Sequence, residues 1–341
     1  MTNAGLVKKI SEVNILVGPI IKELLTRDVE KQNAELAFYQ CNMGGKRLRP
    51  TLVVICGQIF GADIKDLIYP AAAIEILHNA TLITDDIIDH STTRRDQPTC
   101  WSKFGKSIAE CEVLVYVASA FAGLSHTQNS SKLIDLYGRT LKIVIDGEIK
   151  DILFERSGRQ DENYVVQNRY KTITKNDYFE MIGQKTAVLL QASCEAGAIC
   201  AGAGDEEVKL VGNVGYNLGI AFQIQDDILD IFGDEKEFGK KIGKDIIEKK
   251  MGNLLILLAI EQLEPAEKAI VVGLLEGEKG ISDDDVVTVK SLIGKTDAKK
   301  VALDLAQSHI KIAYESLKTL PDNIYRQELE SAIEYVVGRK K

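Results

Sequence analysis

HNATLITDDIIDHSTTRRDQPT, residues 78–99, is the stretch that indicates both a fold and a site. Its apolar residues recur at helical spacing, and each residue of a helix advances by about 100°, so Asp85 and Asp89 lie on one face with Asp86 beside them. His78 lies two turns before Asp85 in the same sector. The stretch therefore predicts a helix that carries three carboxylates on one side.

A second stretch, LGIAFQIQDDILDIFGD at 218–234, repeats the arrangement. A helix here would bring four polar side chains within an arc of about 100°: Gln223, Asp226, Asp227 and Asp230. For one such motif alone, the alternative interpretation is an acidic helix face exposed to solvent. Two copies inside apolar helices argue against that interpretation. Like charges one turn apart repel each other, so the motifs imply a bound cation.

The type of cation follows from the ligands. Oxygen donors without cysteine or a histidine pair select Mg²⁺, with Mn²⁺ as the alternative. Mg²⁺ usually shares its coordination shell with substrate phosphate. We therefore expect the two acidic helices to face each other across a cavity and to hold a metal-bound diphosphate.

The rest of the sequence is typical of a helical protein. Only six prolines occur in 341 residues, and none lies between Thr99 and Glu264, where apolar residues keep a helical period. Long helices are predicted at 71–90, 106–124, 132–155, 176–202 and 206–232. No linker long enough to separate domains interrupts them, so we expect an all-α protein with a single domain over residues 1–341.

Composition argues against several classes of function. The net charge of −8 is unlike that of nucleic-acid-binding proteins, which usually carry a basic face. The six cysteines form no CxxC pair and no Cys/His cluster, so neither zinc nor a disulfide framework is indicated. The first residues lack the basic and apolar parts of a signal peptide, and no uninterrupted apolar run approaches about 18 residues. A cytoplasmic protein with reduced thiols is expected.

Cationic residues accompany both acidic motifs. GGKRLRP at 44–50 places three basic side chains beside a Gly-Gly break, where side chains and backbone N–H groups can reach a phosphate. Arg94 and Arg95 follow the first motif. Four lysines and a threonine lie around the second motif: Lys185, Thr186, Lys240, Lys241 and Lys250. Each alone would be a surface charge, but their spacing from two carboxylate motifs favours a diphosphate site.

These motifs resemble those of the trans-isoprenyl diphosphate synthases, also called polyprenyl synthetases. The resemblance runs from about residue 40 to the C-terminus and includes GQKTAVLLQASCEAGA at 183–198 and GKKIGKDIIEKK at 239–250, in the family's order and approximate spacing. It implies a single large helical bundle around a central cavity, of the isoprenoid synthase type, and a homodimer. It also implies a prenyltransferase that condenses isopentenyl diphosphate with an allylic diphosphate to give a longer all-trans polyprenyl diphosphate.

The resemblance also assigns roles to residues. About three Mg²⁺ ions would be held on the allylic diphosphate by Asp85, Asp86, Asp89, Asp226, Asp227 and Asp230, which with Lys185 would form the catalytic set. The same diphosphate would be gripped by Arg94, Lys185, Thr186, Gln223, Lys250, and Lys240 or Lys241. The lysine doublet leaves open which of the two corresponds to the family's single lysine. Isopentenyl diphosphate would be bound by Lys46, Arg49, His78 and Arg95. The basic tail, residues 339–341, would help to close the site.

The length of the product is expected from the same helix. In this family, bulky side chains four and five positions before the first motif block the growing chain, and here these positions are Thr81 and Ala80. We therefore expect products of at least C20, and any transient membrane contact would be made through the lipid product. Deeper residues that could form the floor of the product tunnel, with ordinary core packing as the alternative, are Ile74, Leu77, Tyr116 and Phe121.

Three other functions stay open. A geranylgeranyl-specific short-chain synthase would carry the same motifs. A class I terpene cyclase shares the helical fold and the first motif, but its second motif usually has Ser or Thr where Asp230 stands here. A regulatory subunit of a heteromeric synthase would keep the fold, yet such subunits typically have a damaged acidic motif, and both motifs are intact here.

Overall fold

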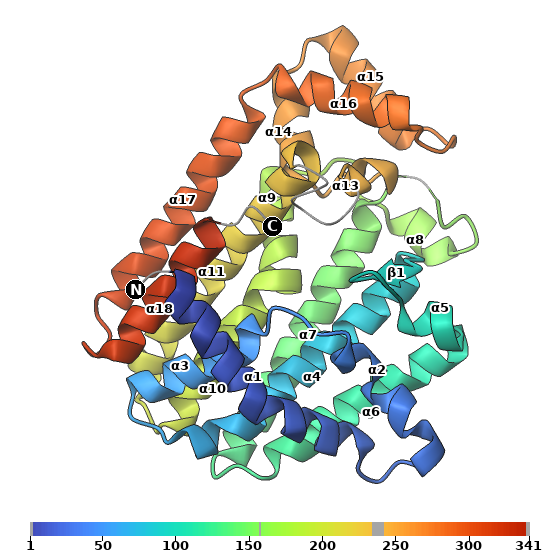
Figure 1. Cartoon of the computed structure of the whole chain (residues 1–341). Helices are drawn as coiled ribbons and strands as arrows, with labels where there is room; N and C mark the ends of the chain where they lie inside the picture. Colours follow the sequence, from blue (N-terminus) through green and yellow to red (C-terminus); the bar gives the residue numbers. More distant parts are fainter. Residues whose placement is uncertain (1–2, 157, 234–241, 339–341) are drawn as a thin grey trace. The chain divides into compact units, whose positions relative to one another are not determined.

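The computed structural model describes residues 3–156, 158–233 and 242–338, and this part of the chain is almost entirely helical (Figure 1). The chain divides into two compact units, each made of separate segments. Unit 1 comprises Met1–Leu141, Leu189–Gly215 and Ser316–Ala332, and unit 2 comprises Lys142–Val188, Tyr216–Glu315 and Ile333–Lys341. The all-α fold predicted from the sequence is confirmed, whereas the single domain stays a prediction.

Unit 1 contains the N-terminal helices. Its elements in chain order are α1 (Asn3–Thr26), a 3₁₀ turn η1 (Lys31–Asn33), α2 (Ala34–Asn42), α3 (Leu48–Ile59), α4 (Ile64–Ile88), β1 (Thr93–Arg94), β2 (Gln97–Pro98), α5 (Cys100–Phe104) and α6 (Lys106–Leu124). Added to these are the beginnings of α7 (Ser130–Phe154) and α11 (Asp205–Phe232), and most of α10 (Val188–Cys200) and α18 (Ile324–Val337). Within the unit, α4 packs against α1, α3 and α6.

Helix α4, which carries the first acidic motif, forms the core of unit 1. It begins at Ile64 rather than at the predicted residue 71, because the Asp63 side chain accepts a hydrogen bond from the Lys65 N–H (3.0 Å) and caps the helix. Pro70 lies inside the helix, and its carbonyl accepts a hydrogen bond from the Tyr137 hydroxyl (2.9 Å). By length and composition α4 could span a membrane, but 67% of its most apolar window is buried, as in the core helix of a globular protein.

Glycines let α3 and α10 approach closely within unit 1. A Cβ at Gly197 of α10 would lie 2.2 Å from the carbonyl oxygen of Val53 and 2.6 Å from the backbone nitrogen of Gly57, both in α3. Helix backbone cannot move aside as the end of a flexible side chain can. This crossing therefore requires glycine at position 197.

A short β-hairpin between α4 and α5 was not predicted. Strands β1 and β2 pair antiparallel, with Arg94 opposite Gln97. Both turn residues have positive φ, 52° at Arg95 and 60° at Asp96, as in a type I′ turn. Such turns favour Asn-Gly or Asp-Gly, so the Arg-Asp pair gives no local signal for this hairpin.

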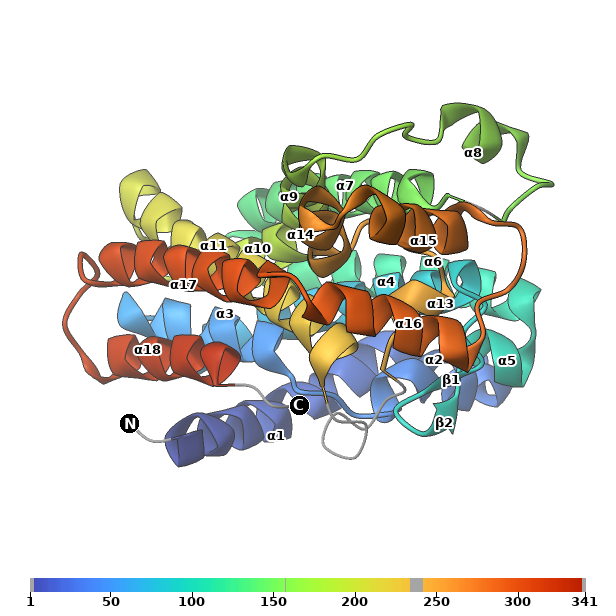
Figure 2. The same ribbon diagram turned by 90° about the horizontal axis from the view of Figure 1, so that it is seen from above.

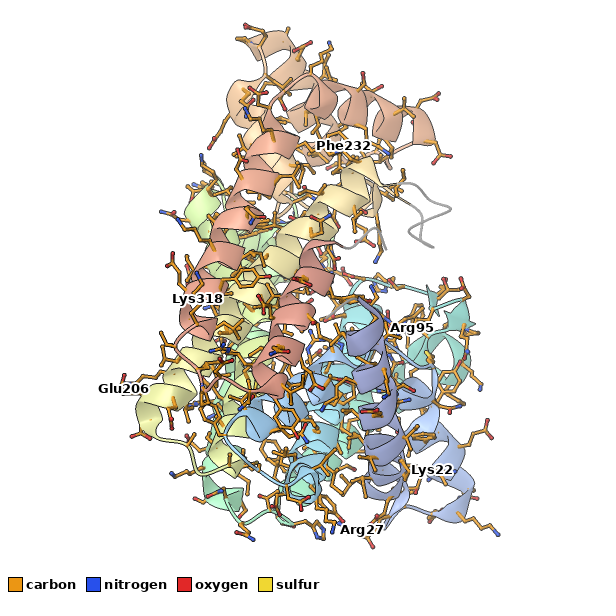
Figure 3. The ribbon with its side chains drawn as sticks, turned by 60° about the vertical axis from the view of Figure 1, so that its left-hand side comes forward. Lys22, Arg27, Arg95, Glu206, Phe232 and Lys318 are labelled. Atoms are coloured by element: carbon orange, nitrogen blue, oxygen red, sulfur yellow. The ribbon has the colours of Figure 1, made fainter. Side chains whose placement is uncertain are left out.

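Unit 2 contains the rest of α7 and α11 together with the C-terminal helices. Its other elements are α8 (Asn163–Asn168), α9 (Lys175–Ile182), a π-helical turn η2 (Gly183–Ala187), α13 (Lys244–Ile247), α14 (Leu254–Gln262), α15 (Pro265–Glu276), α16 (Asp283–Gly294) and most of α17 (Ala298–Leu317). Helices α15 and α16 pack side by side (Figures 1 and 2). Phe232 ends α11 (Figure 3), and the Lys299 ammonium of α17 lies 4.9 Å from the centre of its ring.

We predict that Gly197→Ala destabilises the protein, because the added methyl group would overlap the backbone of α3. The free energy of unfolding should fall by about 1–3 kcal/mol, as in other overpacked contacts. The matched control is Gly273→Ala in α15: nothing lies within 4 Å of a Cβ there, so helix propensity should raise stability by about 0.5–1 kcal/mol. Thermal unfolding followed by circular dichroism measures both variants. A Gly197→Ala protein as stable as the wild type would contradict the packing argument.

Candidate functional site

The first acidic motif lies at the C-terminal end of α4, whose C-cap is Asp89. Asp86 is only 1% exposed and is paired with Arg94 of the hairpin in a two-point contact. Arg94 donates from Nε to Asp86 Oδ2 (2.8 Å) and from its terminal nitrogen to Oδ1 (2.8 Å). Asp85 and Asp89 are partly exposed. Asp86 therefore connects the motif to the hairpin, while its two neighbours lie nearer the surface of unit 1.

His78, on the same helix, lies among arginine side chains. Its pKa is held well below the usual value by burial and by four cationic neighbours: Arg49, Arg95, Arg94 and Arg47. The imidazole is consequently neutral near pH 7 and can both donate and accept a hydrogen bond. The arginines that lower its pKa also make this part of unit 1 electrostatically favourable for an anion such as a diphosphate.

Arg47 differs from the other basic residues of the 44–50 loop. It precedes α3 with φ of 49°, and its largely buried side chain, 10% exposed, forms an ion pair with Glu75 of α4 (2.6 Å). It also donates to the carbonyl of Cys41 (2.6 Å). Arg47 therefore holds the loop in place, in agreement with its absence from the expected substrate-binding residues.

The same loop is tied to the hairpin through Arg95. The guanidinium of Arg95 donates to the carbonyl of Gly44 and lies against Gly45, where a Cβ would come within 2.9 Å of it. Both glycines have positive φ, 82° and 140°. The loop that carries Lys46 and the hairpin that carries Arg95 are thus neighbours, and the close approach requires glycine at position 45.

The second acidic motif, in unit 2, contains a buried carboxylate that joins three helices. Asp227 of α11 is 4% exposed and accepts hydrogen bonds from the Tyr178 hydroxyl (2.9 Å), Gln223 Nε2 (3.0 Å) and the backbone N–H of Leu254 (2.9 Å). Burial, and then the negative charge of Asp245, raise the pKa of Asp227 well above its usual value. Asp227 therefore fixes the positions of α9, α11 and α14 around it.

Asp230, one turn further along α11, holds the start of α13. Its side chain accepts hydrogen bonds from the backbone N–H groups of Lys244 (3.0 Å) and Asp245 (3.2 Å). Burial and the nearby Asp245 charge raise its pKa to about 7. Another part of the motif, Gln223, accepts a hydrogen bond from Thr186 (3.0 Å), so two residues expected to grip the diphosphate are in contact.

Lys185 lies in the π-helical turn η2, a type of distortion that is frequent at functional sites. Its ammonium lies 2.6 Å from Glu148 Oε2 and 2.7 Å from Asp151 Oδ2, both on α7. Lys250 joins this group, with its ammonium 3.9 Å from Asp151 Oδ2 and 3.3 Å from Glu248 Oε2. Burial alone would raise the pKa of Asp151, but the two ammonium groups outweigh it and lower the pKa.

The residues predicted from the sequence thus fall into two sets, one in each unit. His78, Arg94 and Arg95 lie with the first motif, and Lys185, Lys250 and Thr186 lie with or beside the second. Lys240, Lys241 and the basic tail at 339–341 lie outside the described residues. That the two acidic helices face one cavity stays a prediction.

Several residues of these sets were not predicted. Glu148 and Asp151 lie one turn apart in the otherwise amphipathic helix α7, and this acidic pair was a usable signal. The sequence contains no comparable signal for Glu75, Tyr178 and Asp245. The role of each becomes visible only from its contact with another side chain in the structure.

The acidic donors fit a hard divalent cation. Within the described ranges, no three His, Cys, Asp or Glu side chains are gathered into a preformed metal site. Mg²⁺, however, usually takes only one or two protein carboxylates and completes its shell with water and substrate phosphate. The donors of both motifs are carboxylate oxygens. Burial, and then the negative charge of Asp245, raise the pKa values of Asp227 and Asp230, so a cation bound beside them would favour their charged forms.

Comparison with known proteins agrees with these features. Residues 30–293 match the family model described as polyprenyl synthetase. The geranylgeranyl diphosphate synthase of Sulfolobus acidocaldarius is 35% identical over 339 residues, which cover 97% of this chain and 98% of that protein.

Solved structures show the same fold. A polyprenyl synthase from Caulobacter crescentus, complexed with calcium and isoprenyl diphosphate, has a TM-score of 0.89 and 29% identity, and the match covers 100% of this chain and 98% of that one. The geranylgeranyl pyrophosphate synthetase from Pyrococcus horikoshii has a TM-score of 0.87 and 30% identity, with 98% and 99% covered. The chain therefore belongs to the polyprenyl synthetase family and is a prenyltransferase.

Proposed function

We propose that the chain condenses isopentenyl diphosphate with an allylic prenyl diphosphate, in the presence of Mg²⁺, to give an all-trans polyprenyl diphosphate of at least C20. The observation that carries this proposal is the cationic region around His78, which lies beside the first acidic motif and is separate in the chain from the Lys185 and Lys250 group. A reaction of two diphosphates needs two anion-binding groups, whereas a cyclase needs only one.

The six aspartates of both motifs would hold Mg²⁺ on the allylic diphosphate. Asp86 is also paired with Arg94, Asp227 accepts hydrogen bonds from backbone and side-chain groups, and Asp230 accepts them from backbone N–H groups. These contacts would fix the positions of the two motifs. Bound Mg²⁺ would neutralise the departing diphosphate and so favour cleavage of the allylic C–O bond.

The cationic residues would position the two substrates. The ammonium groups of Lys185 and Lys250, which are paired with carboxylates of unit 2, would also contact the allylic diphosphate. Thr186 and Gln223 would form hydrogen bonds to the same diphosphate. Lys46, Arg49, His78 and Arg95 would hold isopentenyl diphosphate so that its alkene meets the ionised allylic carbon. The proton lost at the end would pass to the released pyrophosphate, so no nucleophilic side chain is needed.

The small side chains at the end of α4 support a long product. Ala80 is 2% exposed, and Thr81 donates its hydroxyl hydrogen to the carbonyl of His78 (2.9 Å). The deeper Ile74 and Leu77 are fully buried within unit 1. Tyr116 of α6 is also buried, and its hydroxyl accepts a weak hydrogen bond from the Cys41 N–H (3.4 Å). A geranylgeranyl product in the relatives named above agrees with the proposed minimum of C20.

Replacing either Asp85 or Asp226 by alanine should lower turnover by two or more orders of magnitude with the fold retained, since each removes a proposed metal ligand. Asp66→Asn is the control, because Asp66 is an exposed acid at the other end of α4. Turnover is measured with isopentenyl and farnesyl diphosphates and Mg²⁺, and folding by circular dichroism. Near-normal rates in the alanine variants would exclude the assigned metal roles.

Assays of the wild-type protein also separate the alternatives. Release of a hydrocarbon or alcohol from geranylgeranyl diphosphate alone would favour a cyclase. Activity only after addition of a second protein would favour a regulatory subunit.

Thr81→Phe should shorten the product, because a phenyl ring one turn below Asp85 would block growth of the chain. The expected shift is to C15 as the main product, with Thr81→Ser as the control that keeps the wild-type length. Mass spectrometry of the reaction products measures the chain length made by each variant. Accumulation of only farnesyl diphosphate by the wild type from shorter primers would contradict the proposed open product tunnel.

We also propose that the enzyme acts as a homodimer in the cytoplasm, with membrane contact only through its lipid product. Helix α6 supports the dimer: only 33% of its most apolar window is buried, and its surface includes Leu114 (70% exposed) and Ile108 (42% exposed). An apolar helix exposed to this extent on a soluble protein is typical of a subunit interface. A second copy of the chain is the proposed partner, joined through the same face of each α6.

Leu114→Glu should convert the dimer into a monomer, because two carboxylates would be placed in a self-complementary apolar contact. Ile270→Glu on α15 is the control, since Ile270 is 47% exposed and lies far along the chain from α6. Light scattering after size-exclusion chromatography reports the mass of each variant. A monomeric wild type, or a dimeric Leu114→Glu variant, would rule out the α6 interface.

A further inference from the structure

The β1–β2 hairpin, which carries Arg94 and Arg95, is too small to hold its own conformation. Its strands have two residues each, and both turn residues adopt the left-handed backbone conformation. Isolated hairpins are marginal at best even with longer strands, and a left-handed conformation is unfavourable by about 1 kcal/mol or more for a residue other than glycine. Groups outside the turn must therefore hold it.

Two aromatic residues and a threonine supply this support. The carbonyl of Ser91, before β1, accepts hydrogen bonds from Thr99 Oγ1 (2.8 Å) and from the indole N–H of Trp101 (2.8 Å). The carbonyl of Pro98, in β2, accepts a hydrogen bond from the Tyr39 hydroxyl (2.8 Å). Both ends of the hairpin are thus bound to side chains that lie outside it.

Tyr39 is itself held in place by α5. Its ring meets Phe104 edge-on, with 5.0 Å between the ring centres, and the Lys103 ammonium lies 4.0 Å from the centre of the Tyr39 ring. Edge-on aromatic pairs and cation–π contacts of this kind each contribute about 0.5–1.5 kcal/mol. In both views α2, α5 and the hairpin lie side by side (Figures 1 and 2). Helices α2 and α5 therefore form a brace for the hairpin.

The brace affects the position of Arg95 more than that of Arg94. Arg94 has its own two-point attachment to Asp86, which would survive small movements of the turn. Arg95, labelled in Figure 3, is held by the turn and by its contact with the carbonyl of Gly44. Any loosening of the hairpin should thus displace Arg95 more than Arg94.

We propose that Tyr39 and Trp101 are positioning residues for isopentenyl diphosphate, which act by holding the hairpin so that Arg95 stays beside the loop that carries Lys46. The inference rests on the proposed function, in which Arg95 contacts this substrate. Neither aromatic residue touches the diphosphate. Each acts through one hydrogen bond to a backbone carbonyl of the hairpin or its approach.

Tyr39→Phe tests the brace with a minimal change, because it removes one hydroxyl from a partly exposed side chain and keeps the ring contacts. Loss of one hydrogen bond should raise the KM for isopentenyl diphosphate by about fivefold to tenfold. The kcat and the KM for the allylic substrate should stay within about twofold, since Arg94 is attached independently. Trp101→Phe should act in the same direction. The control is Tyr164→Phe, which removes a hydroxyl from a side chain that is 70% exposed on α8.

A double variant separates positioning from general loosening of the fold. If Tyr39 acts through Arg95, then Tyr39→Phe should have no further effect on the KM for isopentenyl diphosphate once Arg95→Lys is present. Equal effects of Tyr39→Phe in both backgrounds, or an equal rise in both KM values, would overturn the proposal.

Binding can also be measured without turnover, which separates failure of this inference from failure of the proposed function. Trp101 is the only tryptophan in the sequence, so its fluorescence reports on the hairpin directly. Titration with isopentenyl diphosphate should change the emission and give a Kd about fivefold to tenfold higher in Tyr39→Phe than in the wild type. Unchanged Kd values would refute the brace even if the enzyme is active. A higher Kd in Tyr39→Phe, together with a wild-type protein that does not catalyse the condensation, would support the brace and contradict the proposed reaction.

Discussion

A carboxylate removed from water must be matched by donors or cations, and this requirement organises both acidic motifs. Asp86 is matched by the guanidinium of Arg94, Asp227 by a hydroxyl, an amide and a backbone N–H, and Asp230 by two backbone N–H groups. Apart from the amide of Gln223, which lies on α11 itself, the donors come from segments that follow the acidic helix or pack on it. Burial of the carboxylates therefore fixes the hairpin after α4 and the α13 segment after α11, which are the segments that carry cations.

The helices of this protein could be predicted because apolar periodicity is a local property of the sequence. The predicted segments 106–124 and 206–232 correspond to Lys106–Leu124 and Asp205–Phe232. The predicted segment 176–202 was interrupted by the π-helical turn at Gly183–Ala187, where a Cβ at Gly183 would lie 2.5 Å from the Tyr216 hydroxyl. This distortion and the hairpin depend on contacts between distant residues, and a local pattern cannot reveal them.

The same distinction applies to the site. The aspartates and Lys185 stand in recognisable motifs, so the sequence indicated them directly. Arg47 stands in such a motif too, and the family resemblance left it out of the expected substrate-binding residues. The structure supplies the physical reason, because its guanidinium is paired with Glu75, 28 positions away along the chain. Glu148 and Asp151 form an acidic pair that is visible in the sequence, but that pattern alone does not reveal their contact with Lys185, which lies on another element.

On the proposed assignment, the lysine group of unit 2 would present cations to an anionic substrate within an acidic protein. Lys185 and Lys250 are surrounded by three carboxylates, those of Glu148, Asp151 and Glu248, so the group carries no excess positive charge by itself. A diphosphate that entered alone would compete with these carboxylates and leave them uncompensated, which is unfavourable in a largely buried setting. A divalent cation that arrived with the diphosphate would reduce this penalty, because it neutralises charge from both sides. On the proposed assignment, unit 2 is therefore suited to the metal–diphosphate complex rather than to either component alone.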